Sequence, residues 1–513
     1  MSAQTYKTAS ANIILADYPD PDVIRVEDAY YMVSTTMHFM PGCVILRSYN
    51  LVDWEIASYV YTELDGTNGQ RLWNDRGVYG QGMWAASLRH HNGIFYVAFV
   101  ANDTHKTYLY TSSNINGPWI KSEISGFYHD MSILFDDDGR VFVVSGNTKI
   151  TLTEMNSDLS GPKKGGINKV IIEDTSERIL GYEGSHFYKI NGKYYIFLIH
   201  WPKGKYRTQA CFVSDSVDGE YKGSDVLNSD LGNWNSGVAQ GGIVQSPDGK
   251  WYGILFQDHG ALGRIPVLVP VSFENDFPVF GESVNGRQIA PQQVYVPDLR
   301  PDYKYKSLWN NEFVKDGKLV ETWQWNHIPD PRYFKLEENK LSITTGKIVK
   351  NVCQAVNTLT QRPLTEIFSA SVKLDASEIK EGDFAGLCAL EGDYGFIAIT
   401  KNGKKYKLVV AERETEVEPF KIGSVDTGYA KIISEVELKK PVVYLRSDFD
   451  FSCGKENVQF YYCEEKSKVY NQLGIPKKLR FTLDQFVGCR FSLFNFSTKE
   501  SGGTAVFSDV KRN

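Results

Sequence analysis

Three acidic residues in the first half of the chain, Asp20, Asp130 and Glu183, occupy equivalent positions in a repeated pattern. Each lies eight positions before an Asp or Asn at a predicted turn, and Trp84 and Gln240 hold the same position in two further copies. A carboxylic acid can protonate a leaving oxygen and a carboxylate can activate water, and cleavage of a glycosidic bond needs both. A third carboxylate can tune the pKa of the acid and hold it in position. The pattern therefore predicts a catalytic site with three acids.

The turns in this pattern are of one kind. Each turn residue is followed by Gly, or by Ala in the first copy, and then by an aromatic or β-branched run; the turn residues are Asp28, Asn92, Asp138, Asn191 and Asp248. Asn-Gly and Asp-Gly before such a run predict a β-hairpin, because the turn needs φ > 0. The turns recur every 46 to 64 residues, which is blade spacing for a β-propeller. The innermost strand of a blade starts near the propeller axis. The five residues that lie eight positions before the turns are therefore expected to meet in one funnel.

A second motif repeats between these hairpins. It occupies residues 48–54, 112–119, 156–162 and 214–221, where Gly or Asp makes a turn and an aromatic residue often follows. We expect it to connect later strands of each blade, which strengthens the repeat.

The repeat ends near Pro291, Pro297 and Pro301, so the sequence predicts a linker at residues 291–310. Short alternating segments follow, which is typical of a β-sandwich. The predicted fold is all-β: a five-bladed β-propeller over residues 1–300, then a C-terminal β-sandwich of jelly-roll or concanavalin-like type over residues 301–513.

Composition excludes several classes of protein. The chain of 513 residues has a net charge of −6 and no basic stripe, which argues against nucleic acid as a partner. The sequence contains no run of about 18 apolar residues, so no membrane span is predicted. The seven cysteines include no CxxC motif, so zinc binding is not predicted. Most are expected to be buried and free, and one or two disulfides among the five in the second half are the alternative. The start lacks the apolar core of a signal peptide, which leaves a cytoplasmic location, or a periplasmic or extracellular one if a signal has been removed.

Several motifs together resemble glycoside hydrolase family 43. The first three are Tyr-Pro-Asp-Pro-Asp at 18–22, His-Asp-Met-Ser-Ile-Leu-Phe-Asp-Asp-Asp-Gly at 129–139 and Gly-Tyr-Glu-Gly-Ser-His-Phe-Tyr-Lys at 181–189. The others are Ala-Gln-Gly-Gly-Ile-Val at 239–244, followed by Phe-Gln-Asp-His-Gly-Ala-Leu-Gly-Arg at 256–264, and Trp-Gln-Trp-Asn-His-Ile-Pro at 323–329. One departure is Trp84-Ala85-Ala86, where the family usually has Trp-Ala-Pro. The resemblance covers nearly the whole chain.

The resemblance implies an inverting mechanism with assigned roles. Asp20 would be the general base, Glu183 the general acid and Asp130 the residue that keeps Glu183 protonated and oriented. Inversion implies about 6.5–9.5 Å between acid and base, which leaves room for the water. Arg264 would donate hydrogen bonds to sugar hydroxyls or to Asp130.

The same resemblance suggests the walls of the sugar pocket. Trp84, Phe39 and Met37 are the predicted walls, because aromatic faces pack on the C–H surfaces of sugars. Gln240 faces the funnel by its register. His259 is a candidate beneath the site, where the family can hold a calcium ion, but a buried, hydrogen-bonded histidine is the preferred interpretation. No cofactor is required, and a structural calcium stays open.

The function implied is an exo-acting α-L-arabinofuranosidase that acts on side chains of plant hemicellulose. A β-D-xylosidase, or an enzyme with both activities, would share all three acids. Arabinose is preferred over xylose only because the loop with Met37 and Phe39 is less aromatic than the pattern associated with xylosidases. An endo-acting arabinanase would need an open cleft. Alternatives of another class are a non-catalytic carbohydrate-binding protein and an interaction scaffold, neither of which needs three acids in one register.

Overall fold

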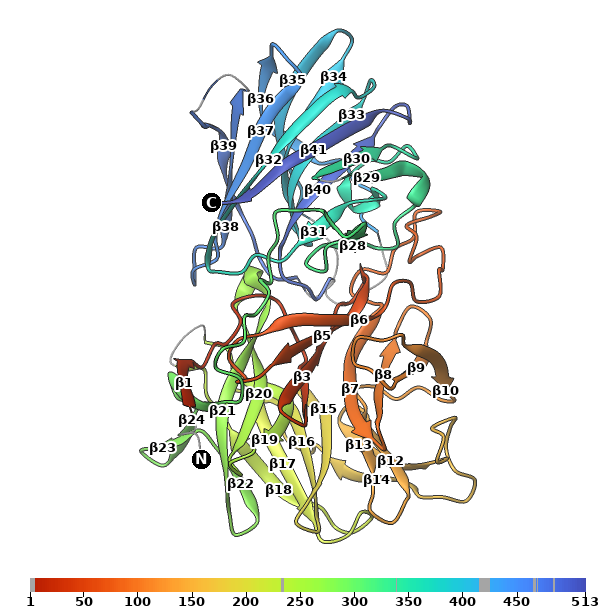
Figure 1. The fold of residues 1–513 in the computed structure, drawn as a ribbon, viewed down its shortest axis with the longest axis vertical. Coiled ribbons are helices and arrows are strands. Elements are labelled where there is room, and N and C mark those ends of the chain that lie inside the picture. Colours follow the sequence, from red (N-terminus) through yellow and green to blue (C-terminus); the bar gives the residue numbers. More distant parts are fainter. Residues whose placement is uncertain are drawn as a thin grey trace.

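The fold is that of a computed structural model, which describes residues 5–231, 235–337, 339–414, 425–464, 467, 469–482 and 485–513. Within these residues nearly all regular structure is β-strand, and the three helices are single 3-10 turns: η1 (Gly260–Leu262), η2 (Pro331–Tyr333) and η3 (Val352–Gln354). The chain forms two stacked parts, with the first half of the sequence in one and the second half in the other (Figure 1). The predicted all-β fold is confirmed.

Five four-stranded antiparallel sheets make up most of the first part of the described chain. Four of them are formed by consecutive strands, and blade 1 skips only the short strand β4 (Phe39–Met40). Blade 1 contains β2 (Asp22–Val26), β3 (Ala29–Ser34), β5 (Gly42–Ser48) and β6 (Glu55–Tyr61). Blade 2 contains β7 (Met83–His91), β8 (Ile94–Ala101), β9 (Lys106–Ser112) and β10 (Ile120–Ile124). Blade 3 contains β11 (Ser132–Phe135), β12 (Val141–Ser145), β13 (Lys149–Met155) and β14 (Asn168–Glu173). Blade 4 contains β15 (Arg178–Ile190), β16 (Lys193–Pro202), β17 (Thr208–Ser214) and β18 (Lys222–Leu227), and blade 5 contains β19 (Ala239–Gln245), β20 (Trp251–Asp258), β21 (Arg264–Glu274) and β22 (Phe277–Phe280). This is the predicted five-bladed propeller.

Turn chemistry fixes the first hairpin of each blade. Asn92 and Gly93 adopt φ of 50° and 77°, and Asn191 and Gly192 adopt 50° and 82°, as two-residue hairpin loops require. In blade 1 the residue with positive φ is Glu27, at 56°, so Asp28 is the second residue of that loop. The second repeated motif lies, as predicted, between the third and fourth strands of blades 1 to 4.

The predicted linker is partly structured. β25 (Gln293–Asp298) pairs antiparallel with β1 (Thr5–Ser10), because alternate residues Val294 and Val296 are buried in the propeller core. Two further hairpins join β23 (Glu282–Val284) to β24 (Arg287–Ile289) and β26 (Val314–Lys315) to β27 (Lys318–Leu319). We propose that the domain boundary lies near residue 300, between β25 and β26.

Two packed sheets form the second part. One has the order β36 (Lys431–Leu438), β35 (Lys405–Glu412), β34 (Gly395–Asn402), β33 (Asp383–Leu390), β40 (Arg490–Ser497), β31 (Leu359–Gln361), β28 (Gln324–Asn326) and β4 (Phe39–Met40). The other has the order β29 (Phe334–Glu337), β30 (Lys340–Thr344), β41 (Thr504–Arg512), β32 (Ile367–Glu378), β37 (Val442–Asp450), β38 (Asn457–Glu464) and β39 (Asn471–Lys478). Their shared core includes the fully buried Trp323 and Phe491. The predicted β-sandwich is confirmed.

One sandwich sheet extends into the propeller. β4 comes from blade 1, yet it pairs with β28, so Phe39 lies opposite Asn326 and Met40 opposite Trp325. Main-chain pairing across the two parts holds Phe39 and Met40 against the sandwich, whereas Met37 pairs with Met83 of blade 2.

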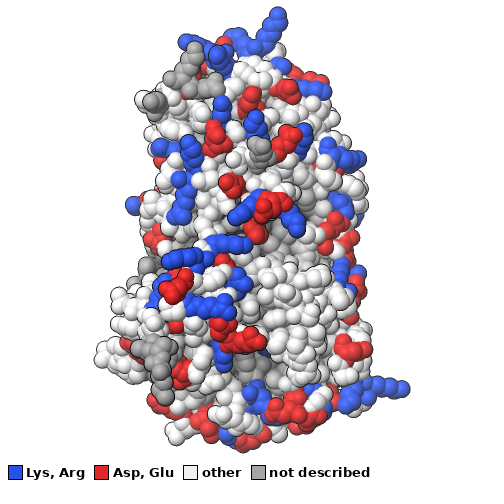
Figure 2. Space-filling view, viewed as in Figure 1, with Lys and Arg blue, Asp and Glu red and all other residues white. Residues whose placement is uncertain are grey.

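The surface charges and the cysteines match the predictions made from the composition. Acidic and basic side chains are interspersed over both parts on the face in Figure 2. All seven cysteines are free, and only Cys453 is exposed. No helix in the described part of the chain is long and apolar enough to cross a membrane.

Candidate active site

The five residues that share the predicted register meet in one narrow recess on the propeller face that carries the sandwich. Asp20, Trp84, Asp130, Glu183 and Gln240 line it, together with Met37, Ala85, Arg264 and Phe486. Its cavity volume is about 50 Å³.

Irregular backbone at the start of each innermost strand aims these side chains inward. The β-ladder shifts register between Met83 and Ala86, between Glu183 and His186, and between Ala239 and Gly241. Such bulges re-aim a side chain and are frequent beside active sites. Asp20, Asp130 and Gln240 also adopt positive φ, at 52°, 47° and 58°. Non-glycine residues rarely adopt this strained conformation, and it clusters at functional sites.

Asp20 forms a buried ion pair with Arg264. Arg264 Nη1 donates to Asp20 Oδ1 at 2.9 Å, and each side chain is 7% exposed. Burial raises the pKa of Asp20, and the guanidinium of Arg264 opposes that rise without cancelling it. The expected direct bond from Arg264 to Asp130 is absent from the described contacts, because the guanidinium is turned toward Asp20 and the backbone of Phe486.

Asp130 and Glu183 form a second acidic group, with His129 between them. His129 Nε2 lies 3.3 Å from Glu183 Oε2 and 3.8 Å from Asp130 Oδ2. The backbone N–H of Gly184 donates to Asp130 Oδ2 at 3.1 Å, and Asn147 Nδ2 donates to Glu183 Oε2. Burial raises the pKa of Asp130, His129 opposes this rise, and the charge of Glu183 adds to it.

The two carboxylates govern the charge of His129. Burial would lower its pKa, but the carboxylates of Asp130 and Glu183 outweigh burial and raise the pKa to about 9. His129 is therefore a cation at neutral pH and donates its Nε2 proton toward Glu183. The ring of Trp84 lies edge-on to it at 5.6 Å.

The sandwich supplies part of the recess wall through Phe486. Its backbone oxygen accepts from Arg264 Nη2 at 3.2 Å, and its ring lies 5.7 Å from that guanidinium and 6.1 Å from the ring of Trp84. Asp17 holds this segment in place, because its carboxylate accepts from the backbone N–H groups of both Arg264 and Gly488, each at 3.0 Å.

The predicted pocket walls separate into two groups. Met37, Trp84 and Gln240 line the recess. Phe39 does not line it: its side chain is 1% exposed, and the guanidinium of Arg490 lies 4.1 Å from its ring. Pairing of β4 with β28 turns Phe39 toward the sandwich, and this removes the sequence-based preference for arabinose.

His259 lies in the core rather than in the recess. It is fully buried, its Nε2 lies 2.9 Å from Gln257 Oε1, and burial lowers its pKa to about 3. The run Asp136–Asp138 forms the loop of the β11–β12 hairpin. Among the described residues, one group of three potential metal ligands lies within 4.8 Å of one another: His129, Asp130 and Glu183. One imidazole and two carboxylates are a poor match for calcium, which takes 6–8 oxygen ligands.

Sequence reasoning missed four residues of the site: His129, Asn147, Asp17 and Phe486. His129 had a usable signal, since it directly precedes Asp130 in the repeated register. Asp17 and Phe486 had none, because the docking of a sandwich loop on blade 5 gives them their positions, and that loop carries no repeat.

A ring of inward-facing carboxylates on a five-bladed propeller, closed by a β-sandwich, defines a glycoside hydrolase. The chain belongs to the glycosyl hydrolases family 43, whose family model matches residues 10–278. Residues 310–511 match a model described as the beta xylosidase C-terminal concanavalin A-like domain.

The names of the relatives give two activities. A beta-xylosidase of Formosa agariphila is 25% identical over 96% of this chain and 88% of its own length. The non-reducing end alpha-L-arabinofuranosidase BoGH43B of Bacteroides ovatus is 25% identical over 79% of this chain and 78% of its own. Among solved structures, a bifunctional GH43-CE protein of Bacteroides eggerthii is 38% identical with a TM-score of 0.89. That alignment covers 99% of this chain, which spans only 64% of the Bacteroides eggerthii chain.

Proposed function

We propose that the protein is an exo-acting, inverting glycosidase that removes one terminal pentose, α-L-arabinofuranose or β-D-xylose, from hemicellulose chains. The observation that carries this proposal is the narrow recess in which Asp20 and the Asp130/Glu183 pair come from different blades. Phe486 of the sandwich forms part of its wall, which favours binding of the end of a chain, whereas an endo-acting enzyme needs an open cleft.

Asp20 suits the role of general base. Burial raises the pKa of its carboxyl, which makes the Asp20 carboxylate a stronger base than that of an exposed aspartate. Its contact with Arg264 fixes one carboxylate oxygen. In the proposed step, Asp20 removes a proton from a water molecule as that water attacks the anomeric carbon.

Glu183 suits the role of general acid, with His129 and Asp130 as its partners. The leaving oxygen needs a proton, and His129 holds one 3.3 Å from Glu183 Oε2. The charge of Glu183 also raises the pKa of Asp130, as expected for two carboxyls held close together. The proposal thus assigns the acid, the base and the proton store to side chains of the chain itself, with no cofactor.

Two sugars remain candidates, each with its own support. Several relatives are named beta-xylosidase, among them proteins of Formosa agariphila and Bacillus subtilis. The Bacteroides ovatus relative supports arabinofuranose, and so does a solved GH43 enzyme, 25% identical, whose engineered form is described as showing endo-xylanase and exo-arabinofuranosidase activity.

Release of 4-nitrophenol from the α-L-arabinofuranoside and the β-D-xyloside tests the proposal. Turnover of at least one glycoside, lost in Asp20→Ala, is the expected result, and the ratio of kcat/KM values identifies the sugar. If neither nitrophenyl glycoside nor any arabinoxylan or xylan fragment releases pentose, the proposed function is wrong.

A further inference from the structure

A large groove lies on the same propeller face as the recess, between blades 4 and 5. We call it the rim groove; it has a cavity volume of about 920 Å³, and its walls include Trp201, Lys205, Arg207, Asp225, Asn228 and Asp258. These residues lie at strand ends: Trp201 near the end of β16, Arg207 just before β17 and Asp258 at the end of β20. Because β15 pairs antiparallel with β16, Trp201 lies two residues beyond the partner of Glu183.

The rim groove and the recess share structural supports. The guanidiniums of Arg207 and Arg264 lie 6.0 Å and 5.3 Å from the same ring, that of Phe256. Asp258, which pairs with Arg207, is also the ladder partner of Arg264. The groove therefore begins one side chain away from the recess.

Trp201 gives the groove a fixed aromatic surface. Its Nε1 donates to the backbone oxygen of Lys205 at 2.9 Å, and the guanidinium of Arg207 lies 5.4 Å from its ring. The side chain is still partly exposed. A held, partly exposed indole is suited to pack on the C–H face of a pyranose ring.

The charges in the rim groove are balanced in pairs. Lys205 Nζ lies 2.9 Å from Asp225 Oδ2, and Arg207 forms an ion pair with Asp258. Paired charges leave polar atoms to bond hydroxyl groups but provide no net charge for an acidic ligand. This favours a neutral sugar chain over a uronate.

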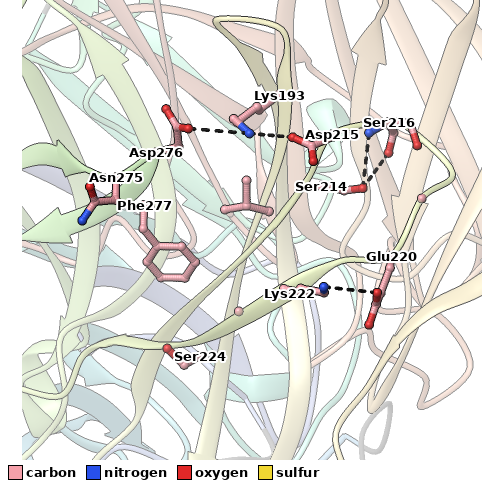
Figure 3. A pocket seen from close by; sticks show the side chains of 13 residues that line it. Lys193, Ser214, Asp215, Ser216, Glu220, Lys222, Ser224, Asn275, Asp276 and Phe277 are labelled. Atoms are coloured by element: carbon pink, nitrogen blue, oxygen red, sulfur yellow. Dashed lines mark hydrogen bonds and ion pairs between the residues drawn. The ribbon is translucent and has the colours of Figure 1, made fainter.

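The direction of the proposed reaction points to the same occupant. The general acid must lie beside the leaving oxygen, so the departing chain extends on the side of Glu183, away from Asp20. Glu183 belongs to blade 4, where the rim groove begins. A second hollow between blades 4 and 5 lies at the opposite strand ends, beside the β15–β16 turn, where Lys193 pairs with Asp215 and Asp276 (Figure 3). Its position excludes it from this role.

We propose that the rim groove binds the departing part of the substrate, a neutral chain of pyranose units, with Trp201 as its stacking surface. This inference rests on the proposed function, because it takes Glu183 as the general acid. It makes Trp201 a determinant of preference for oligosaccharides over small glycosides.

Trp201→Ala tests the inference, with Trp73→Ala as its matched control. Trp73 is also an exposed tryptophan with a guanidinium, that of Arg71, 5.6 Å from its ring, and it lines neither the groove nor the recess. Trp201→Ala should lower kcat/KM on a pentose-capped xylotetraose about tenfold more than on the 4-nitrophenyl glycoside, as the loss of one stacking contact predicts. Trp73→Ala should change both substrates alike, and equal behaviour of the two variants would overturn the inference.

Binding gives a readout that does not depend on turnover. In the Glu183→Gln background, titration with xylotetraose should show about tenfold weaker binding when Trp201→Ala is added. Lys205→Ala, which changes an exposed side chain, should weaken binding by a smaller factor and serves if Trp201→Ala fails to fold. If the wild-type protein shows no pentosidase turnover but binding still depends on Trp201, the groove is sustained and the proposed function is refuted. If the wild-type protein is active and neither Trp201→Ala nor Lys205→Ala weakens binding, the groove alone is refuted.

Discussion

The carboxylate of Asp17 accepts a hydrogen bond from the backbone N–H of Gly488 at 3.0 Å, although 471 positions separate the two residues in the chain. The other oxygen of Asp17 accepts from the backbone N–H of Arg264. One buried side chain thus ties the propeller strand that carries Arg264 to the sandwich loop that carries Phe486. The sandwich is therefore built into the active site.

Asp17→Asn should raise KM about tenfold and lower the melting temperature. The amide keeps one acceptor oxygen, so one of the two backbone N–H groups loses its partner, which costs about 1–3 kcal/mol in a buried site. Steady-state kinetics and thermal unfolding measure the two effects. Asp136→Asn is the matched control, because Asp136 is equally buried at 4% exposure and accepts from Lys189 and Tyr194. An equal rise in KM in the control would contradict the account.

The two proposed catalytic carboxyls should respond differently to the leaving group. Glu183→Gln should lower kcat about 10³-fold on an oligosaccharide but far less on a 4-nitrophenyl glycoside, because nitrophenolate departs with little protonation. Asp20→Asn should lower kcat on both substrates by a similar factor, since attack of water limits each. The reverse pattern would exchange the assigned roles.

His129 should set the alkaline limit of activity. Its pKa is raised to about 9, so the proton beside Glu183 is lost as pH rises through that value. In His129→Gln the alkaline limb of the kcat/KM profile should move down by about one pH unit or more. An unchanged limb would show that a group other than His129 sets the alkaline limit.

The raised pKa of His129 also predicts that the stability of the protein depends on pH. A raised folded-state pKa means that the contribution of His129 is fully present below about 6.5, its unfolded value, and is lost as pH rises toward 9. The difference in melting temperature between wild type and His129→Gln should therefore be larger at pH 6 than at pH 10.

The absence of a side chain at Gly184 leaves room for Gln240, and Gly192 provides a control for the effect of backbone strain alone. Gly184 adopts φ of +62°, and a Cβ there would lie 2.7 Å from Cγ of Gln240, so Gly184→Ala should displace the N–H that binds Asp130. Gly192 on the same hairpin adopts +82° with open space around it. Both alanine variants should lose about 1 kcal/mol of stability through backbone strain, but only Gly184→Ala should lose activity, about tenfold or more by the Asp130 contact. Matched losses of activity would show that strain alone is responsible.

The sequence was informative wherever structure repeats. Hairpin turns such as Asn191-Gly192 set the blade register, and the register alone placed Asp20, Asp130, Glu183 and Gln240 around one axis. It failed where tertiary docking decides. Phe39 is predicted as a pocket wall because an aromatic face can pack on a sugar, but pairing of β4 with the sandwich turns its side chain away. β25 falls within the predicted linker, because the local sequence does not reveal its pairing with the distant β1.

The stereochemistry of the first product tests the central claim most directly. Proton NMR during early hydrolysis of the preferred 4-nitrophenyl glycoside resolves the anomer that forms before mutarotation. A single displacement by a water activated by Asp20 predicts the inverted sugar, β-L-arabinose from the α-L-arabinofuranoside or α-D-xylose from the β-D-xyloside. First appearance of the retained anomer would mean a covalent intermediate, and Asp20 would then not be the base described here.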